Sequence, residues 1–550
     1  MGALPMQGLM QDVPLTLDLI LRRAVQQGHG LHVASAGADG VRHLAWPEIG
    51  DRALRVAGAL DRLGVPAGAR VGTFAWNSHR HLELYFGVPC SGRVLHSANV
   101  RLHPDHVCYA IDHAGDEVLF VDASLTPTLA PLRDRLGVRE YVVMDDGAPS
   151  HDAFADCPGY EELLAGSEPV EALPELSEGG AASVCFTSGT TGRPKAVVYS
   201  HRSVVLHAMG ALMVDSHAIR RGDVVLPLTP MFHVNCWGLP YSSALAPASL
   251  VLAGSDTSPA AVARLIESER ATVVAGIPTF WVQMDGVFAS GEFDLSSVRR
   301  ILCGGAEAPP SLISRYLERG IDFLHAWGMT EMSPSGTANW LAADGGVDDA
   351  GPGRPVPGVE LRLVGADGAE LPWDGRSVGE LEARGPWVAR AYHQPDDDAN
   401  ESRFRDGWLR TGDVARIRPD GNVELVDREK DLVKSGGEWI SSLDLERAIV
   451  SHPDVVEAAV IAVPDERWGE RPAALVVPAK DARPDPEELR AFLAGKVASW
   501  WLPEVIEIVV DLPKTAVGKY DKRRLREEHA ARLATVLESA RTPIEQGATR

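Results

Sequence analysis

The fold is decided by the stretch Ala182-Ser-Val-Cys-Phe-Thr187-Ser188-Gly189-Thr190-Thr191-Gly192-Arg-Pro-Lys195-Ala-Val-Val-Tyr-Ser-His201. Its apolar start, Ser183 to Phe186, predicts a buried strand. The loop of Gly, Ser and Thr residues that follows suits a polyphosphate, because glycines let the backbone approach, N–H groups bind the anion and Lys195 adds positive charge. A flexible polar loop is the alternative interpretation. No Lys follows Gly192 directly, so this is not the G-x-x-x-x-G-K-[ST] phosphate loop.

The motif Thr187-Ser-Gly-Thr-Thr-Gly-x-Pro-Lys195 resembles the signature of the adenylate-forming superfamily. This superfamily contains acyl-CoA synthetases, the adenylation domains of peptide synthetases and beetle luciferase. Within it, the chain looks like the medium- and long-chain fatty-acid:CoA ligases and the methylthiopropionate:CoA ligases over nearly its whole length. Four further motifs follow in the family's order: His325-Ala-Trp-Gly-Met-Thr-Glu331, Trp408-Leu-Arg-Thr-Gly-Asp413, Lys434-Ser-Gly-Gly-Glu-Trp439 and Pro513-Lys-Thr-Ala-Val-Gly-Lys519.

Composition narrows the class of protein and of partner. A chain of 550 residues with 45% hydrophobic and 23% charged residues is typical of a globular protein with more than one domain. The net charge of −23 argues against nucleic acid as a partner. Six cysteines without a C-x-x-C pair indicate reduced thiols and a cytoplasmic location. We expect neither a signal peptide nor a membrane span, since no basic leader and no run of ~20 apolar residues occurs.

Alternating strands and helices before residue 350 predict an α/β fold with parallel sheets covered by helices. Helices are expected at Trp46–Leu63, Thr126–Leu136 and Pro486–Ser499. After residue 350, short strands predict a β-subdomain. We therefore expect a large N-terminal AMP-binding domain over residues 1–427, and a small, mobile α+β C-terminal domain over residues 428–550 that carries the catalytic lysine.

The resemblance implies a site for ATP and Mg²⁺. Glu331 and Thr187 would hold Mg²⁺, which prefers one or two carboxylates together with phosphate oxygens. Asp413 would accept hydrogen bonds from the ribose hydroxyls, and Arg428 would contact ribose or phosphate, although here Asp427 replaces the Gly that often precedes this Arg. The nucleotide-binding residues implied are Thr187, Ser188, Gly189, Thr190, Thr191, Gly192, Lys195, Gly305, Ala306, Glu307, Ala326, Trp327, Gly328, Met329, Thr330, Asp413, Arg428, Lys430, Lys434 and Trp439.

The resemblance also places CoA and the catalytic lysine. Ser435, Gly436 and Gly437 would form a hairpin that lets the thin pantetheine arm of CoA approach closely. The Pro-Lys-Thr-x-x-Gly-Lys pattern maps the catalytic lysine onto Lys519, although a basic run of this kind is usually a solvated face. The chemistry favours a cation there, because a carboxylate that attacks the α-phosphate brings two anions together.

The acyl pocket is predicted around Met231-Phe-His233-Val-Asn-Cys-Trp237. Amino-acid-activating relatives carry an Asp just after the Phe, where it pairs with the substrate ammonium; this chain has His233. An acid with an uncharged tail is therefore expected, because an unpaired buried ammonium is costly. In long-chain synthetases the Trp at position 237 gates a fatty-acid tunnel, and ligases of short thioether acids share the same pieces. We include His233 with Lys519 and Glu331 among the catalytic residues.

These motifs predict an ATP-dependent acid:CoA ligase that forms acyl-AMP and pyrophosphate and then transfers the acyl group to CoA. The acid is an apolar-tailed one, with 3-(methylthio)propionate or another short or medium acid as the alternative to a fatty acid. Two rivals of other kinds are a module that loads a carrier protein in trans and a non-catalytic nucleotide or acyl sensor. Luciferase-like oxidation is more distant. A homodimer through Met1–Arg23 is a further expectation, by likeness to long-chain relatives.

Overall fold

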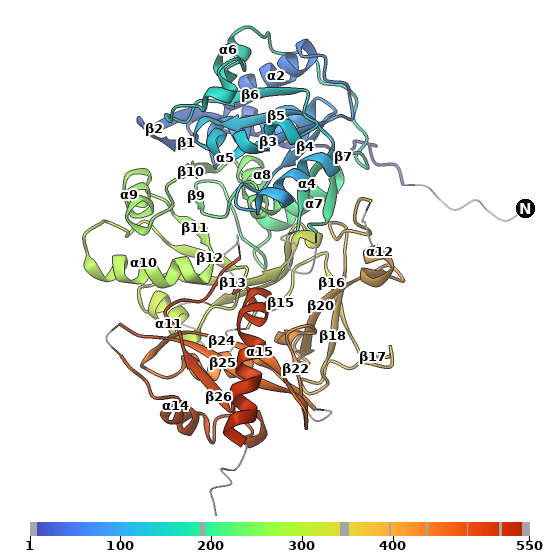
Figure 1. Cartoon of the computed structure of the whole chain (residues 1–550). Coiled ribbons are helices and arrows are strands. Elements are labelled where there is room, and N and C mark those ends of the chain that lie inside the picture. The colour runs from blue at the N-terminus through green and yellow to red at the C-terminus, as the bar shows by residue number, and fades with distance from the viewer. Residues whose placement is uncertain are drawn as a thin grey trace, which may run out of the picture.

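The computed structural model describes residues 8–187, 193–341, 351–394, 398–435, 438–480, 482–515 and 520–541, without the side chains of 438, 439 and 538–541. The α/β fold class is confirmed. Two sheets of mainly parallel strands are followed by a β-subdomain and by a small α+β part at the carboxyl end (Figure 1). In Figure 1 these parts follow one another from the blue strands at the top to the orange and red elements at the bottom.

The sheet at the amino-terminal end is six-stranded, in the order β6-β5-β3-β4-β7-β8. Its strands are parallel except β8, which pairs antiparallel with β7. β7 reads as the predicted continuous buried strand, since its residues from Ala182 to Phe186 are buried. The strands are β3 (Arg70–Phe74), β4 (Val94–Ser97), β5 (Asp116–Asp122), β6 (Glu140–Met144), β7 (Ala181–Phe186) and β8 (Ala196–Ser200), and the helices are α2 (Trp46–Arg62), α3 (His79–Cys90), α4 (Pro104–Ala114), α5 (Thr126–Leu129) and α6 (Tyr160–Ala165).

The second sheet is nine-stranded, in the order β15-β14-β13-β12-β11-β9-β10-β1-β2. Its six central strands run parallel, whereas β2 at one edge and β14 and β15 at the other are antiparallel to their neighbours. The strands are β1 (His32–Gly37), β2 (Gly40–Ala45), β9 (Val224–Pro227), β10 (Ser249–Leu252), β11 (Val273–Gly276), β12 (Arg300–Gly304), β13 (Asp322–Gly328), β14 (Ser335–Leu341) and β15 (Arg354–Pro355), and the helices are α1 (Leu17–Gln27), α7 (His201–Leu212), α8 (Leu239–Leu245), α9 (Pro259–Glu269), α10 (Pro278–Ser290) and α11 (Pro310–Glu318).

The β-subdomain and the carboxyl part each form a sheet of their own. The predicted boundary after Asp427 falls one residue before the end of β21, and the division into 1–427 and 428–550 stays a prediction. The subdomain contains β16 (Glu360–Val364), β17 (Glu370–Leu371), β18 (Gly379–Arg384), α12 (Ala399–Arg403), β19 (Phe404–Arg405), β20 (Trp408–Ile417) and β21 (Val423–Arg428). The carboxyl part contains β22 (Val433–Ser435), β23 (Glu438–Ile440), α13 (Ser442–Val450), β24 (Val455–Asp465), β25 (Gly469–Pro478), α14 (Pro486–Leu493), β26 (Val505–Ile508) and α15 (Lys522–Arg541).

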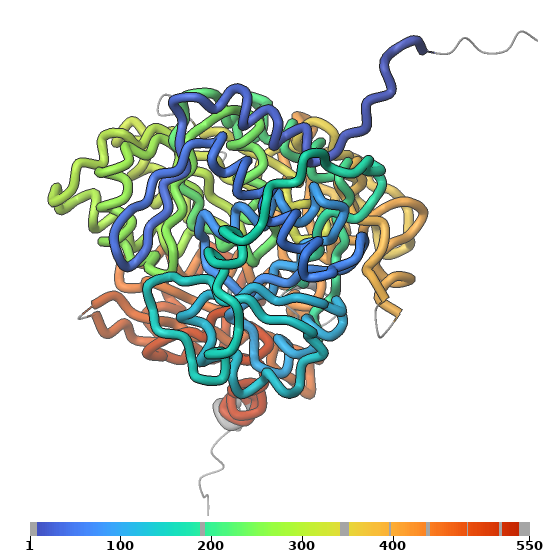
Figure 2. The backbone as a smooth tube through the Cα atoms, turned by 90° about the horizontal axis from the view of Figure 1, so that it is seen from above, coloured from blue at the N-terminus to red at the C-terminus, as the bar shows by residue number. Residues whose placement is uncertain are grey.

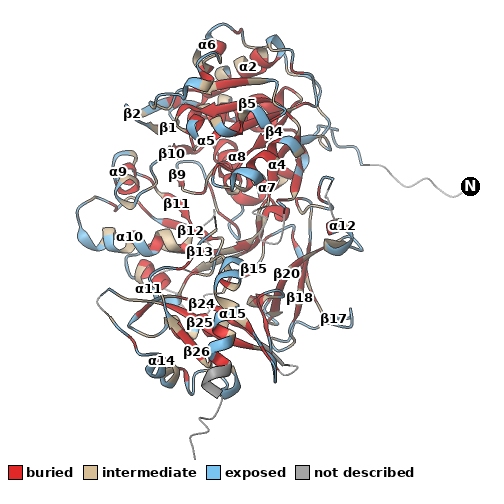
Figure 3. Ribbon diagram, in the orientation of Figure 1, coloured by how far each residue is buried: buried red, intermediate tan, exposed pale blue. Residues whose placement is uncertain are grey.

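One apolar core joins both parallel sheets through α1, α2, α3, α7 and α8. Figure 3 shows this as buried residues concentrated in the sheets, with exposed residues on the outer faces of the covering helices. Trp46 at the start of α2 is fully buried, and its indole N–H donates to the carbonyl of Ala248 at 2.8 Å. The described segment before α1 runs away from the body when the chain is seen from above (Figure 2), and Leu9 and Met10 there are 90% and 87% exposed.

Two predicted helices are shorter in the structure. The helix expected over Thr126–Leu136 continues after α5 as a 3₁₀ segment, Ala130–Arg135, because Pro131 cannot donate a backbone hydrogen bond. The helix expected over Pro486–Ser499 ends at Leu493, and Gly495 beyond it has a positive φ of 88°. Three-residue 3₁₀ turns lie at Ala123–Leu125, Asp152–Phe154, Thr330–Met332 and Ser499–Trp501.

The cysteines form no disulfide, as their spacing predicted. Five of the six are buried, and Cys157 is partly exposed. Burial raises the pKa of the Cys185 thiol to about 12 and raises the pKa of Cys90 and Cys236 as well. Among the described helices, none combines the length and the apolar character that crossing a bilayer requires.

Candidate active site

A cavity of about 810 Å³ opens where the parallel sheets, the β-subdomain and the carboxyl part meet. Thr187 follows β7, Gly305 follows β12 and Glu331 follows β13, so the carboxyl ends of parallel strands supply much of the wall, as is usual for ligand sites in such sheets. Predicted site residues in the wall are Thr187, Lys195, His233, Trp237, Gly305, Ala326, Trp327, Gly328, Met329, Thr330, Glu331, Arg428 and Lys430.

The two ends of the predicted phosphate loop are fastened to each other. The backbone N–H of Thr187 donates to the carbonyl of Lys195 at 3.0 Å, and the N–H of Lys195 donates to the Thr187 hydroxyl at 3.0 Å. The loop is therefore fixed at its base by the antiparallel pair β7 and β8. Ser188, Gly189, Thr190, Thr191 and Gly192 lie outside the described residues.

Glu331 presents a fixed carboxylate beside the base of this loop. It is 9% exposed, and the hydroxyl of Tyr392 donates to its Oε1 at 2.5 Å. Its own carbonyl accepts from the N–H of Ala389 at 2.7 Å, and the hydroxyl of Tyr199 donates to the carbonyl of Thr330 at 2.6 Å. A carboxylate and the Thr187 hydroxyl in one wall fit the oxygen ligands of Mg²⁺, which takes its remaining ligands from phosphate and water.

Asp413 does not line the cavity, but it forms an ion pair with Arg428, which does. It is directly opposite Arg428 in the β20–β21 register, and the Arg428 Nε donates to its Oδ1 at 3.1 Å. The indole N–H of Trp327 donates to Oδ2 at 2.8 Å. Each carboxylate oxygen has a second lone pair, so capacity remains to accept from two ribose hydroxyls. Asp413 also raises the pKa of Arg428, which keeps the guanidinium charged.

The predicted CoA hairpin is described at its two strands. β22 and β23 pair antiparallel, with Ser435 opposite Glu438, while Gly436, Gly437 and the side chain of Trp439 lie outside the described part of the chain. Arg471 donates to the hydroxyl of Ser435 at 3.2 Å. The exposed Lys434 is not in the cavity wall, whereas burial lowers the pKa of Lys430 within it.

The loop that carries Lys519 is closed at both ends against the cavity. Lys514 and Tyr520 form an antiparallel bridge, and the N–H of Asp521 donates to the carbonyl of Pro513 at 2.8 Å. Thr515 and Tyr520, on either side of residues 516–519, both line the cavity. Lys519 itself lies outside the described residues, so its role stays a prediction.

Sequence reasoning missed the buried ion pairs that hold the start of α15. The Lys522 ammonium lies 2.7 Å from Glu446 and donates to the Ser442 hydroxyl at 2.6 Å. Burial alone would lower the pKa of Lys522, but Glu446 and Asp427 raise it on balance. The sequence pointed to these ion pairs only through the basic run after Lys519, and a run of this kind is as readily explained by a solvent-exposed surface.

The segment predicted to form the acyl pocket contains an unusual turn. Asn235, Cys236 and Trp237 have φ values of 51°, 54° and 55°, a left-handed turn that costs roughly 1–2 kcal/mol per residue. Buried contacts hold it in place: the Asn235 amide donates to the Ser183 hydroxyl at 3.1 Å, and the Cys236 thiol donates to the carbonyl of Thr229 at 2.9 Å.

The turn lays the Trp237 ring beside two glycines. A methyl group on Gly304 would lie 3.6 Å from the ring, and one on Gly305 would lie 4.0 Å away. Neither glycine can gain a side chain without narrowing this end of the cavity, and Gly305 also has a positive φ of 85°. The neighbouring wall residues are His233, Leu228, Ile277 and Phe280.

Two predicted nucleotide residues after β12 are outside the wall. Ala306 does not line the cavity, and Glu307 is engaged by Arg447 of α13, whose Nε donates to Oε1 at 2.5 Å. This ion pair links the second parallel sheet to the carboxyl part. The assignment of Ala306 and Glu307 to the nucleotide stays a prediction.

Comparison with known proteins shows the family of the chain. Residues 21–393 match the family of AMP-binding enzymes, and residues 444–519 match the AMP-binding enzyme C-terminal domain. The chain is 42% identical to 3-methylmercaptopropionyl-CoA ligase of Ruegeria lacuscaerulensis, over 95% of this chain and 99% of the relative. It is 41% identical to long-chain-fatty-acid–CoA ligase of Thermus thermophilus, over 96% of this chain and 98% of the relative.

A similar solved structure is that of the anthranilate CoA ligase AuaEII in complex with anthranoyl-AMP. It matches with a TM-score of 0.85 at 25% identity and covers 96% of this chain and 100% of the other. ATP-bound MatB from Rhodopseudomonas palustris matches with a TM-score of 0.80 at 26% identity, over 94% of this chain and 99% of the other. The chain therefore belongs to the AMP-binding enzymes, the adenylate-forming superfamily that its phosphate-loop motif predicted.

Proposed function

We propose that this AMP-forming ligase activates an apolar-tailed carboxylic acid with ATP and transfers the acyl group to CoA. One observation carries the proposal. A single cavity is lined both by charged side chains, among them Glu331 and Arg428, and by apolar ones, among them Trp237 and Phe280. ATP and the tail of the acid can thus be held together, with the carboxylate between them.

In the first half-reaction an oxygen of the carboxylate attacks the α-phosphorus of ATP, and the bond to pyrophosphate breaks. Asp413 and Arg428 orient the ribose, and the loop between Thr187 and Lys195 holds the phosphates. Lys519 stabilises the negative charge that gathers on the reacting oxygens. Thr187 and Glu331 would hold Mg²⁺, which neutralises phosphate charge when bound.

In the second half-reaction the sulfur of CoA attacks the acyl carbonyl carbon, the bond to AMP breaks and the thiol proton is released. We infer that the small domain, residues 428–550, swings about Lys430 between the two steps. The swing withdraws Lys519 and brings the Gly436-Gly437 turn to the cavity, with Ser435 beside it. Hinge closure of this kind is an ordinary way to complete a site in stages.

The acid is inferred from the names of the relatives and from the apolar lining of the cavity. The relatives are named for 3-methylmercaptopropionate and for long- and medium-chain fatty acids. The Trp237 ring lies beside Gly304 and Gly305 in the cavity wall and takes up space there, which supports a short or medium tail. His233 lies in the same wall and would orient the carboxylate, so it belongs with the catalytic residues of the proposal.

A cytoplasmic location and a homodimer complete the proposal. Free thiols at all six cysteines suit a reducing compartment. Exposed apolar residues before α1, namely Leu9, Met10 and Val13, offer a segment that a second copy could cover.

The decisive experiment is a panel of carboxylic acids from short thioether acids to long fatty acids, assayed for AMP formation with and without CoA. The proposal expects turnover of at least one acid and a thioester product with free CoA. Acyl-AMP that accumulates with CoA present but is consumed on adding a carrier protein would favour the loading module instead. No turnover of ATP with any acid would favour the sensor.

A further inference from the structure

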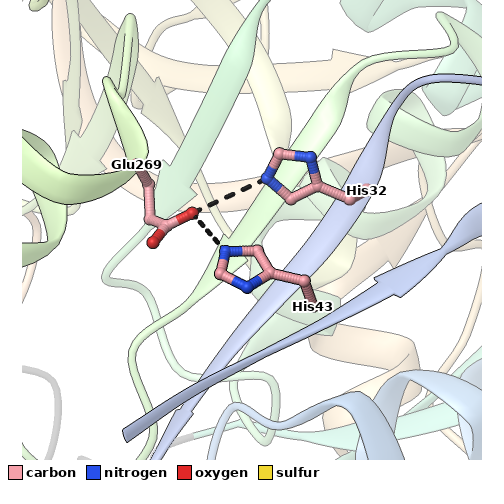
Figure 4. A group of neighbouring side chains, drawn as sticks. All are labelled: His32, His43 and Glu269. Carbon is pink, nitrogen blue, oxygen red and sulfur yellow. Dashed lines mark hydrogen bonds and ion pairs between the residues drawn. The ribbon is translucent and has the colours of Figure 1, made fainter.

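Two histidines and a glutamate converge at the outer edge of the nine-stranded sheet, away from the cavity wall. They are His32 on β1, His43 on β2 and Glu269 at the end of α9 (Figure 4). His43 Nε2 lies 2.8 Å from Glu269 Oε2, and His32 Nε2 lies 3.6 Å from the same oxygen. All three side chains point toward one another, and neither the proposed ligase chemistry nor the cavity uses any of them.

The local fold explains why these residues meet. In the antiparallel β1–β2 hairpin His43 is opposite Ala34, two residues along from His32, so both imidazoles are on the same face. Ala34 on that face packs into the core formed with α9, through residues such as Val262 and Ile266. Helix α9 therefore lies over this face and brings Glu269 to the histidines.

The charges and hydrogen bonds of the cluster are incomplete as they stand. The Glu269 side chain is 7% exposed, and its ion-pair partners within the described residues are the two imidazoles. The buried Nε2 of His32 has no hydrogen-bond partner among the described residues. A nearly buried carboxylate and an unsatisfied imidazole nitrogen both gain from a cation placed between them.

The position of Glu269 adds to this need. It is the last residue of α9, and no basic residue lies in the last turn of that helix. A negative side chain at a helix C-terminus is unfavourable, because the helix dipole is negative there. A positive ion at this point would offset both the carboxylate and the dipole.

We propose that His32, His43 and Glu269 bind one divalent transition-metal ion of the zinc class. Imidazole nitrogen suits Zn²⁺, Co²⁺ or Ni²⁺, whereas Mg²⁺ and Ca²⁺ prefer oxygen ligands alone. Ligand atoms around a tetrahedral zinc ion lie roughly 3.3 Å apart at bond lengths of about 2.0–2.1 Å. The three atoms here lie within 4.8 Å of one another, so small side-chain rotations complete the site. The His43 side chain is 50% exposed, which leaves room for water as a fourth ligand.

The ion would join the edge hairpin to helix α9 and so fasten the end of the sheet. The hairpin is also tied to the neighbouring strand, since the N–H of His32 donates to the hydroxyl of Ser249 at the start of β10. Because the ligands come from three elements, the metal would stabilise the fold. The ligase reaction is unchanged, since none of the three residues lines the cavity.

The test uses the full chain without a histidine tag, stripped with a chelator and titrated with Zn²⁺ in excess Mg²⁺. The expected result is one zinc per chain, with binding weakened at least about tenfold by His43→Ala and by Glu269→Gln, since even outer partners of metal ligands cost 10–100-fold. His103→Ala is the matched control: His103 is also exposed beside a second histidine, but its ring centroid is 6.4 Å from that of His106. The control should bind zinc like the unmodified chain.

Two results would overturn the site. One is equal zinc binding by the unmodified chain and by the double variant of His43→Ala with Glu269→Gln. The other is the absence of an anomalous scattering peak between the three side chains in crystals soaked with zinc. The crystallographic measurement needs no variant, and it decides the question even if a substitution disturbs folding.

Discussion

The two ends of the cavity are built on different principles. At the predicted nucleotide end two charged groups are each held by a partner: Arg428 pairs with Asp413, and the hydroxyl of Tyr392 donates to Glu331. At the predicted acyl end a left-handed turn sets the Trp237 ring beside the backbone of two glycines.

This contrast explains how one scaffold can keep its nucleotide and change its acid. Charged hydrogen bonds discriminate strongly, because a wrong ligand leaves buried polar groups unpaired. A wall made of an aromatic ring and glycine backbone discriminates between acids by their volume alone. One methylene group changes the binding free energy by only about 1–3 kcal/mol in such a pocket. Substitutions among the charged groups should therefore lower activity with every acid, and substitutions at Trp237 should change which acid is preferred.

The largest effect is expected for Lys519→Ala. Loss of this cation should slow pyrophosphate release on the order of 10² to 10³-fold, while thioester formation from supplied acyl-AMP continues. Lys496→Ala, an exposed lysine over the Phe492 ring, is the matched control. Separate assays of the two half-reactions check the result, and equal loss in both would contradict a lysine that serves only the first.

A smaller loss is expected for Asp413→Ala. The substitution removes the partner of Arg428 and of the Trp327 indole, and a broken charge pair of this kind costs several kcal/mol when buried. The Arg428 side chain is 38% exposed, so solvent screening reduces the effect to about ten- to thirtyfold in kcat/KM for ATP. The kcat/KM of Asp413→Asn for ATP should fall between that of the unmodified chain and that of Asp413→Ala. An unchanged KM for ATP in both variants would remove Asp413 from the nucleotide site.

Trp237→Ala should alter the choice of acid more than the rate. Removal of the ring opens the apolar end, so the preference should move toward longer or bulkier tails by about tenfold, within the range for pocket volume. The KM for ATP should stay the same. Phe288→Ala, an aromatic truncation on α10 outside the cavity wall, controls for loss of stability. An equal fall in kcat/KM for every acid would show that the ring positions the substrate and does not select its tail length.

The smallest effect is expected for Arg447→Ala. Its side chain is 39% exposed and that of Glu307 is 26% exposed, and ion pairs of this kind contribute at most about 1 kcal/mol. Because the pair joins α13 to the large sheet, its loss should change the ratio of the two half-reactions a fewfold, and high salt should do the same. Glu307→Gln sharpens the comparison: a raised KM for ATP in this variant alone would place Glu307 at the nucleotide.

The sequence predicts most of the fold and the charged residues of the candidate site. The continuous apolar run of β7, the Thr-Gly-Asp motif at Asp413 and the Trp-Gly-Met-Thr-Glu motif at Glu331 are local patterns, so they can be read from neighbouring residues. Thr187 and Glu331 lie in one cavity wall, as expected of residues at the carboxyl ends of parallel strands, and Arg428 joins them from the end of the antiparallel strand β21.

What the sequence could not predict depends on partners distant in the chain. The left-handed turn over residues 235–237 is stabilised by Ser183 and Thr229, and the residues next to Asn235 show no pattern that predicts it. The buried pair of Lys522 and Glu446 joins residues from the start of α15 and from α13. The β1–β2 hairpin was missed because its outer strand is mostly exposed and shows little apolar alternation.

The distribution of thiols has a practical consequence for watching the enzyme move. Five cysteines are buried and Cys157 alone among the six is partly exposed, so alkylating reagents should reach Cys157 first. A fluorophore at Cys157, and a second dye at a cysteine introduced on α14, would test the proposed rotation of the carboxyl part during turnover. The native chain thus already supplies a selective attachment point for single-molecule distance measurements.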